Sequence, residues 1–455
     1  MGSEWQTYAL TDLYSVSSGL SKPAKDFGEG HPFVSFKDVF YNFFLPDELS
    51  QLVKSSEKEQ EKCSVRRGDV FLTRTSETME DLGMSCVARK DYPNATFNGF
   101  SKRLRPSTEL PIHPEYVGYY LRTPQFRNEM LAFSTMSTRA SLNNDMIGRL
   151  QITLPPLPEQ KAIAHILGTL DDKIELNRRM NATLEGIAQA LFKSWFVDFD
   201  PVIDNALAAG NPIPDELAPR AEVRKNALAN GTTQQGSVDH PTLSDPQSLF
   251  PAAFEYDDEL GPIPEGWEVR PLAEEVQLTM GQSPSSDHYN TEGNGLPFHQ
   301  GVTNYGTRFP KHEQFSTGGN RYAEDGNVLF SVRAPVGRIN LADRKLIIGR
   351  GLAALRHKED YQSFLVYFLK HTFATEDSIG SGTIFNAVNK KEMERIHLIV
   401  PPDETTGAFD DYANSLDKKI ASNAEQTETL TKLRDTLLPK LISGTLRIAE
   451  GPPNN

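Results

Sequence analysis

Arginine residues flank glycine-rich turns in the second half of the sequence. Arg333 and Arg338 stand on either side of an Ala-Pro-Val-Gly turn, and Arg350 lies between two glycines. Glycine lets a loop backbone approach a ligand closely, and a guanidinium group can pair with phosphate or with the edge of guanine through two hydrogen bonds. A solvated turn is the alternative interpretation of each arginine. The basic residues for which we predict DNA contact are Lys22, Arg66, Arg67, Arg74, Lys102, Arg103, Arg105, Arg139, Arg308, Arg333, Arg338 and Arg350.

Uncharged polar residues in loops form a second group of candidates. The loop 281–286 is rich in serine and is matched in the first half by the loop 18–23. Small hydroxyl side chains can approach a phosphate backbone closely, although a plain turn explains such loops equally well. The run 299–308 carries side chains that could read base edges, but asparagine is also common in ordinary turns. The uncharged candidates are Ser283, Ser285, His299, Gln300, Asn304 and Thr383.

The sequence offers no constellation of residues for catalysis. Pro155-Pro156 superficially resembles the Pro-Pro of amino-methyltransferases, but Leu154 stands where a polar residue would be needed. No glycine fingerprint for a nucleotide cofactor accompanies it, and no Walker loop occurs. The histidines lack the spacing of metal ligands, and Cys63 and Cys86 cannot form a metal cluster alone. We therefore expect no catalytic residue, no metal and no cofactor in this chain.

The acidic charge of the chain is concentrated in one segment. The net charge is −14 over 455 residues, and residues 198–265 alone contribute −10. The remainder is close to neutral and can still present a basic face, because the local field decides whether an anion binds. Many prolines, small residues and acids predict that the segment is an irregular linker with at most short helices, such as one around 216–229. Without a signal or membrane-spanning pattern, we expect a cytoplasmic protein.

The sequence contains an internal repeat, which bears directly on the assignment of the fold. Leu170-Asp171-Asp172-Lys173-Ile174 returns 246 residues later as Leu416-Asp417-Lys418-Lys419-Ile420. The strand and double proline before each motif repeat at the same offset. Inside the two larger regions the offset drifts between 262, 258 and 248. A fixed offset predicts elements whose length matters, whereas a drifting offset predicts domains that tolerate insertions.

Two long helices follow from the apolar spacing. Residues 158–197 and about 403–443 alternate steps of four and three, which is a heptad seam. Two such helices in one chain are expected to pack on each other, antiparallel, with the large domains at opposite ends. Arg434 interrupts the second seam where Ala188 stands in the first, so we expect that turn to be less buried. The predicted seam residues are Ile163, Leu167, Leu170, Ile174, Asn177, Leu184, Leu191, Leu416, Ile420, Asn423, Leu430 and Leu437.

Several motifs carry a family resemblance. Residues 154–164 together with 170–177 closely resemble the central constant region of Type I restriction–modification specificity subunits. Residues 191–202 are similar to the end of that region, and 261–267 resemble the entry to a second target-recognition domain. The second helix departs from the pattern, since Asp403-Glu404-Thr405-Thr406 replaces the usual Leu-Pro-Glu-Gln type.

The resemblance implies a fold and a function. It implies an α+β chain with two mixed α/β target-recognition domains separated by two long antiparallel coiled-coil helices with pseudo-two-fold symmetry. Each domain would read one half of a split double-stranded DNA target, and the helices would set the gap and bind two methyltransferase subunits. Restriction subunits would join through the complex, and S-adenosylmethionine, ATP and Mg would belong to the partners. The expected segments are the first recognition domain (1–154), first spacer helix (155–197), acidic linker (198–262), second recognition domain (263–400), second spacer helix (401–445) and tail (446–455).

Two other classes of protein are compatible with parts of the sequence. A methyltransferase or nuclease would show activity in the purified chain, but its motifs are missing. A coiled-coil scaffold that binds no DNA would explain the seam alone and would show no sequence-dependent binding even with partners present.

Overall fold

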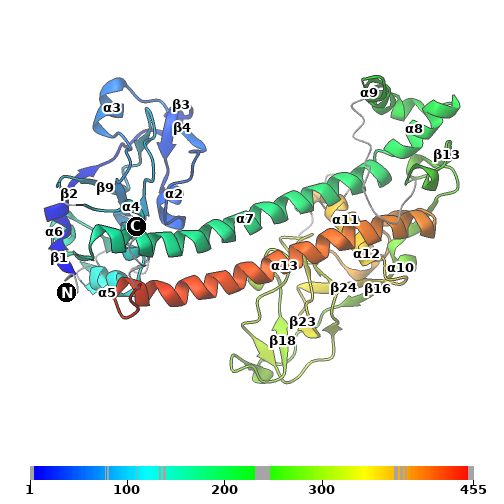
Figure 1. Cartoon of the computed structure of the whole chain (residues 1–455). Coiled ribbons are helices and arrows are strands. Elements are labelled where there is room, and N and C mark those ends of the chain that lie inside the picture. Colours follow the sequence, from blue (N-terminus) through cyan, green and yellow to red (C-terminus); the bar gives the residue numbers. More distant parts are fainter. Residues whose placement is uncertain are drawn as a thin grey trace, which may run out of the picture. The chain divides into compact units, whose positions relative to one another are not determined.

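The computed structural model describes residues 5–76, 78, 81–109, 111–132, 135–136, 140–230, 246–373, 378–379, 383–384 and 387–448. The chain divides into two compact units, residues 1–175 with 427–455, and residues 176–426. Two helices of 40 residues each, α7 (Leu157–Phe196) and α13 (Asp403–Ile442), contribute to both units (Figure 1). Each unit also contains one domain built on a four-stranded sheet.

The domain of the first unit is organised by an antiparallel sheet in the order β2-β9-β5-β7. Strand β5 is buried on both faces, which explains the apolar run Val70-Phe71-Leu72. Val70 and Leu72 share a cluster with α4, whereas Phe71 points to a second cluster and packs on Phe97. The elements are β1 (Gln6–Ala9), α1 (Leu10–Leu13), β2 (Tyr14–Ser18), β3 (Phe27–Val34), α2 (Phe36–Tyr41), β4 (Gln51–Val53), α3 (Glu57–Lys62), β5 (Val70–Thr73), β6 (Thr75–Ser76), β7 (Ser85–Val87), β8 (Thr96–Phe97), β9 (Ser101–Pro106), α4 (Pro114–Tyr120), α5 (Pro124–Ala132), β10 (Thr135–Met136), β11 (Ala140–Ser141), α6 (Asn144–Arg149) and β12 (Gln151–Leu154).

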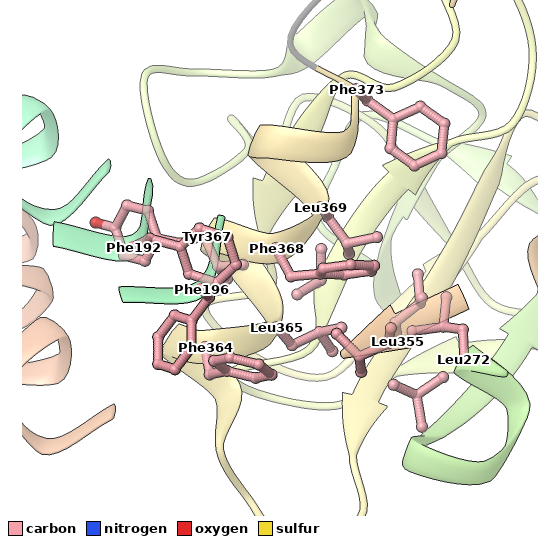
Figure 2. Close-up of a cluster of buried hydrophobic side chains, with 14 of the residues drawn as sticks. Phe192, Phe196, Leu272, Leu355, Phe364, Leu365, Tyr367, Phe368, Leu369 and Phe373 are labelled. Carbon is pink, nitrogen blue, oxygen red and sulfur yellow. The ribbon is translucent and has the colours of Figure 1, made fainter. Parts of the chain in front are cut away.

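The domain of the second unit repeats this order with β16-β24-β21-β22. Helix α11 covers the sheet and is buried without interruption from Ser363 to Leu369, because Phe192 and Phe196 of α7 pack on its other side (Figure 2). The elements are α10 (Leu272–Glu275), β15 (Glu268–Pro271), β16 (Val276–Met280), β17 (Tyr289–Asn290), β18 (Leu296–His299), β19 (Phe315–Ser316), β20 (Tyr322–Ala323), β21 (Val328–Ser331), β22 (Ile339–Leu341), β23 (Leu346–Ile348), β24 (Leu352–His357), α11 (Gln362–Thr372), β25 (Ser378–Ile379), β26 (Thr383–Ile384), α12 (Lys390–Glu394) and β27 (His397–Val400).

The first and last strands of each domain pair with each other and lead into a long helix. Strand β1 pairs antiparallel with β12, and β15 pairs antiparallel with β27. The double prolines that follow β12 and β27 end the strands, because proline cannot donate to a sheet ladder. The sheet order, closing strand and helix thus occur twice, and the expected α+β fold class is confirmed.

Helices α7 and α13 pack antiparallel in both units. In the first unit Ile163 of α7 shares a cluster with Leu441 of α13, and Asp171 pairs with Arg434. In the second unit Asn181 contacts the Ile420 carbonyl, and Phe192 packs on Phe409. Residue numbers rise along one helix as they fall along the other, which confirms the antiparallel packing expected from the repeat.

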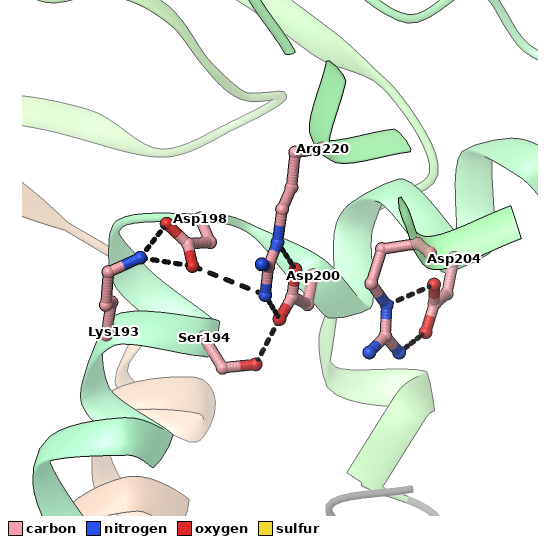
Figure 3. A network of polar contacts seen from close by, with 7 residues as sticks. Lys193, Ser194, Asp198, Asp200, Asp204 and Arg220 are labelled. Atoms are coloured by element: carbon pink, nitrogen blue, oxygen red, sulfur yellow. Dashed lines mark hydrogen bonds and ion pairs between the residues drawn. The ribbon is translucent and has the colours of Figure 1, made fainter. Parts of the chain in front are cut away.

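The acidic segment is more ordered than its composition indicated. It contains α8 (Asp200–Ala209), α9 (Ala218–Ala229) and a hairpin of β13 (Phe254–Asp257) with β14 (Gly261–Pro264). Arg220 donates to Asp200 at 2.7 and 2.6 Å, and Arg224 pairs with Asp204 (Figure 3). Helix α9 confirms the short helix expected around 216–229, whereas α8 and the hairpin add order that the composition did not indicate. The acids neutralise arginines of α9, and the apolar face of α8 is buried. In the described part of the chain no helix is long and apolar enough to cross a membrane.

Candidate nucleic-acid interface

Three loops of the second domain meet at glycines. The Gly281 amide donates to the Leu352 carbonyl at 2.9 Å, and the Gly351 amide donates to the Gln300 carbonyl at 3.1 Å. A Cβ atom on Gly281 would lie 2.1 Å from the carbonyl oxygen of Gly349, and one on Gly351 would lie 2.6 Å from that of Gln300. Both obstacles are backbone atoms, so glycine is required at these positions. We call the loops 281–283, 299–301 and 349–351 the glycine junction.

Of the predicted contact residues in the glycine junction, three are linked to one another by hydrogen bonds: Ser283, Gln300 and Arg350. Ser283 Oγ donates to Gln300 Oε1 at 2.7 Å and accepts from the Arg350 amide at 3.3 Å. The side chains of Gln300 and Arg350 are exposed. A hydroxyl, a carboxamide and a guanidinium are the groups that bind phosphate and base edges, and here a rigid backbone holds all three together.

Arg333 and Arg338 flank the turn between β21 and β22, and both are exposed. The Arg338 amide donates to Ser331 Oγ at 2.8 Å, which ties the turn to the end of β21. Arg338 also lines a cleft of about 660 Å³ against α7, with Lys193 and Lys370. The turn therefore presents positive charge beside the helix.

The first domain places Gly19 where the second has Gly281. A Cβ atom on Gly19 would lie 2.3 Å from the carbonyl oxygen of Asn98. Asn98 follows β8 as Gly349 follows β23, and its buried Nδ2 donates to the Val34 carbonyl at 3.1 Å. The loops thus approach each other closely in both domains, but the residue opposite the first glycine is a buried asparagine, Asn98, in the first domain and a glycine, Gly349, in the second.

The basic candidates of the first domain differ in exposure. Arg66 and Arg67 are exposed, whereas Lys22, Arg74 and Lys102 are half-buried. Arg67 forms an ion pair with a glutamate of α4, and Lys22 forms one with a glutamate of α3. Burial lowers the pKa of Lys102 from its usual value. Arg66 is therefore the best placed for an external anion, because Arg67, although exposed, is already paired with a glutamate.

Arg103 and Arg105 are occupied inside the fold. Arg105 pairs with both carboxylate oxygens of Asp69 at 2.7 and 2.6 Å. Arg103 lies over the Phe97 ring and donates to the Ser64 carbonyl at 2.6 Å. The two arginines hold the sheet to the preceding turn and are not available for the predicted DNA contact in this structure.

Arg308 and His299 are also turned inward. Arg308 is buried and pairs with Asp417 at 2.6 Å and with Glu185 at 3.5 Å, so it ties the domain to both long helices. His299 is buried and shares a hydrogen bond of 3.0 Å with His312. Burial, and then the neighbouring imidazole, lower the pKa of His299 to about 4, so the ring is uncharged at neutral pH. Neither side chain faces an external ligand.

Four candidates remain, of which two have side chains that the structure describes. Ser285 is exposed and Asn304 is half-buried. Thr383 lies on β26, but its side chain is outside the described residues, as is the whole of Arg139. Among the described residues, no group of three or more His, Cys, Asp or Glu side chains could hold a metal ion.

The helix seam is continuous but unevenly buried. Its centre is filled by asparagines: Asn423 Nδ2 donates to Asn181 Oδ1 at 2.9 Å, and Asn181 Nδ2 donates to the Ile420 carbonyl at 3.1 Å. Asn177 Nδ2 approaches the Asn423 carbonyl at 3.5 Å. Arg434 is half-buried, as are its seam neighbours Leu430 and Leu437, and it is paired with an aspartate of α7. Among the predicted seam residues the buried ones are Ile163, Leu167, Ile174, Asn177, Ile420 and Asn423, and the half-buried ones are Leu170, Leu184, Leu191, Leu416, Leu430 and Leu437.

Comparisons with known proteins agree with this architecture. A family model described as "Type I restriction modification DNA specificity domain" matches residues 2–186 and 264–437. The putative type I restriction enzyme MjaX specificity subunit of Methanocaldococcus jannaschii is 26% identical over 454 residues, covering 98% of this chain and 94% of that protein. The HindI specificity subunit of Haemophilus influenzae is 28% identical over 472 residues, covering 98% and 100%. The crystal structure of a Type I S subunit from M. genitalium superposes with a TM-score of 0.54 at 14% identity, covering 96% of each chain, which shows the fold alone.

Proposed function

Because this chain belongs to the family of Type I restriction–modification DNA specificity subunits, we propose that each of its two domains reads one half of a split DNA target. Members of this family are non-catalytic DNA-recognition subunits, so methylation and cleavage belong to other subunits. The observation that carries the proposal is the repeated sheet order, β2-β9-β5-β7 and β16-β24-β21-β22, each followed by a forty-residue helix. Two copies of one reader on helices of fixed length suit a target with two halves at a fixed gap.

The proposed DNA surface of the second domain centres on the glycine junction. Arg350 can pair with guanine and Gln300 with adenine in the major groove, while Ser283 supports Gln300 or approaches a phosphate. Arg333 and Arg338 would then position the backbone of the DNA. Further contacts proposed from the exposed or half-buried candidates are Lys22, Arg66, Arg67, Arg74, Lys102, Ser285 and Asn304.

The long helices are proposed to set the gap and to bind two methyltransferase subunits. Outside the seam both helices are polar and exposed over most of their length, which leaves surface for partners. Restriction subunits would join through the methyltransferases. The partner subunits together would bring S-adenosylmethionine, ATP and Mg. The chain carries a net charge of −14, which opposes binding to the DNA phosphates, so its affinity for DNA would depend on these partners. The proposed location of the complex is the cytoplasm.

A domain exchange tests the assignment of one half-target to each domain. Residues 1–154 would be replaced by the first domain of a relative, and the hybrid would be co-expressed with its methyltransferase. Sequencing that detects methylated adenines should then show one changed half of the target and one unchanged half. A change in both halves would contradict the assignment.

A point variant tests the glycine junction. Arg350→Ala should weaken methylation of the target and relax base preference in one half only, by roughly 10-fold to 100-fold for a bidentate base contact. Arg344→Ala is the matched control, because Arg344 is an equally exposed arginine of the same domain that pairs with the adjacent Asp343. An equal loss in both variants would indicate a general charge effect and would argue against base reading by Arg350.

A further inference from the structure

The repeated aspartate of the two helices makes the same contact in both units. In the first unit, Tyr119 at the end of α4 donates from its hydroxyl to Asp171 Oδ2 at 2.6 Å. In the second unit, Tyr367 of α11 donates to Asp417 Oδ1 at 2.9 Å. Burial, and then the charge of the aspartate, raise the pKa of both tyrosines, so both remain hydrogen-bond donors at neutral pH.

In each unit the aspartate has further partners that involve a second element. Asp171 also accepts from Arg434 of α13 at 2.7 Å, and Arg434 lies over the ring of Phe43 in the first domain. The carboxylate therefore joins α7, α13 and the domain at one point. The sequence indicated only that this turn of α13 would be less buried.

In the second unit the aspartate sits on α13 and its partners come from the domain. Asp417 accepts from Ser363 Oγ of α11 at 2.8 Å and pairs with Arg308 at 2.6 Å. Glu185 of α7 pairs with Arg308 and with Lys370 of α11, which brings in the other helix. The partners differ from those in the first unit, but the same three elements are again joined.

Such contacts fix the geometry of a domain on its helices more than they increase its stability. A buried ion pair adds little net stability compared with apolar side chains of the same volume, but leaving one charge unpaired is costly. Moving a domain along its helix by one turn would displace the carboxylate by about 5.4 Å, beyond reach of the tyrosine hydroxyl. Each domain is thereby restricted to one position and one rotation on the helix pair of its own unit.

We propose that Asp171 and Asp417 are positioning residues that, through Tyr119 and Tyr367, fix the orientation of each recognition domain on the helices and so make the complex selective for one gap length in the DNA. The proposal rests on the function proposed above. It assigns gap selectivity to side chains at the domain–helix junctions in addition to the length of the helices.

The test removes single hydroxyl groups and reads the gap. Tyr119→Phe and Tyr367→Phe would each be co-expressed with the methyltransferase subunit on a DNA library in which the gap between the half-targets varies by single base pairs. Both variants should keep the half-target sequences but should raise methylation at gaps one base pair too long or too short, relative to the correct gap, by roughly tenfold, the scale of one hydrogen bond to a charged group. This ratio does not depend on how much of the complex is folded.

Matched controls exist in both domains. The Tyr116 hydroxyl donates to the Thr153 carbonyl at 3.0 Å and that of Tyr305 to the Leu329 carbonyl at 3.0 Å, both within the domains. Tyr116→Phe and Tyr305→Phe lose the same group without losing a hydrogen bond to a long helix, and should keep the gap preference of the unmodified chain.

The possible outcomes separate this inference from the proposed function. If the unmodified complex methylates no bipartite target, the proposed function fails. If it does, and Tyr119→Phe and Tyr367→Phe keep the original gap preference, only the positioning role is overturned. Equal relaxation in the Tyr116→Phe and Tyr305→Phe controls would also overturn it, because loosening anywhere in the domain would then suffice.

Discussion

Asn177 and Asn423 occupy equivalent seam positions but should respond oppositely to replacement by leucine. Both are 1% exposed. In the described part of the chain Asn177 Oδ1 has no hydrogen-bond partner, and the contact of its Nδ2 is long at 3.5 Å. Asn423, by contrast, donates to Asn181 Oδ1 at 2.9 Å. One side chain carries an unsatisfied buried group, and the other satisfies a neighbour.

The expected magnitudes follow from these contacts. Leucine branches at the same carbon as asparagine but is larger, and it is the usual residue of a heptad seam, so Asn177→Leu replaces a desolvated carbonyl with apolar atoms and should stabilise the unit by about 1–2 kcal/mol. Asn423→Leu removes the short bond and leaves Asn181 Oδ1 without its donor, which should cost about 1–3 kcal/mol. The double variant should lie close to the unmodified chain.

Thermal unfolding followed by far-ultraviolet circular dichroism measures these changes. For a unit of this size each kcal/mol corresponds to a Tm shift of about 2–4 °C. Ser422→Leu is the control, since Ser422 is exposed on the same turn of α13 and its replacement should change stability by no more than about 0.5 kcal/mol. A lower Tm for Asn177→Leu together with a higher one for Asn423→Leu would refute the reasoning.

Three further predictions concern charge and pH. Arg308→Ala should destabilise the second unit by roughly 3–5 kcal/mol in chemical denaturation, because it leaves Asp417 buried without its cation. Replacing Arg308 and Asp417 together by apolar residues should cost much less, because no buried charge is then left unpaired. Equal losses in the single and double variants would contradict this explanation. Burial lowers the pKa of His299 to about 4, so between pH 6.5 and 4 the unfolded state binds a proton that the folded state does not. The folded chain therefore loses stability as the pH falls from 6.5 towards 4, and the loss is about 2 kcal/mol at pH 5. His299→Gln should therefore flatten the acid side of the stability profile, and an unchanged slope would rule out this role. The chain alone should bind its target weakly and with steep salt dependence, and a titration at fixed salt that finds equal affinity with and without methyltransferase would contradict the proposed dependence on partners.

The long helices could be predicted from the sequence almost to their ends. Periodicity predicted 158–197, and α7 spans Leu157–Phe196, because helical spacing and proline stops are local signals. The repeat at a fixed offset likewise predicted the second helix, and α13 spans Asp403–Ile442.

The destination of individual arginines could not be predicted. Arg105 and Arg350 both lie near turns in the sequence, but the carboxylate that binds Arg105 is 36 residues away and becomes a neighbour only through the pairing of β5 with β9. Arg308 meets Asp417 across more than a hundred residues. The local sequence shows that an arginine is present near a turn, whereas the tertiary fold decides whether a carboxylate inside the protein already binds its guanidinium group.

The acidic segment illustrates the same limit. Its composition favours disorder, since it is rich in proline and acids. Arg220 and Arg224 lie 20 residues after Asp200 and Asp204, and these two pairs convert an excess of negative charge into a contact between α8 and α9. Counting charges along the chain misses an interaction that depends on two helices folding back on each other.

The glycine junction has a consequence for how new DNA specificities could arise. Its backbone approaches itself so closely at Gly281 and Gly351 that these positions admit no side chain, while Ser283, Gln300 and Arg350 project from loops that are already held. In the proposed interface, substitutions at Gln300 and Arg350 can therefore alter the chemistry offered to DNA without moving the supporting backbone, whereas Ser283 also accepts a hydrogen bond from the Arg350 amide. Substitutions at Gln300 and Arg350 would change the free energy of unfolding little, whereas substitutions at the glycines would disrupt the loops. Single substitutions could therefore change the DNA target of such a chain.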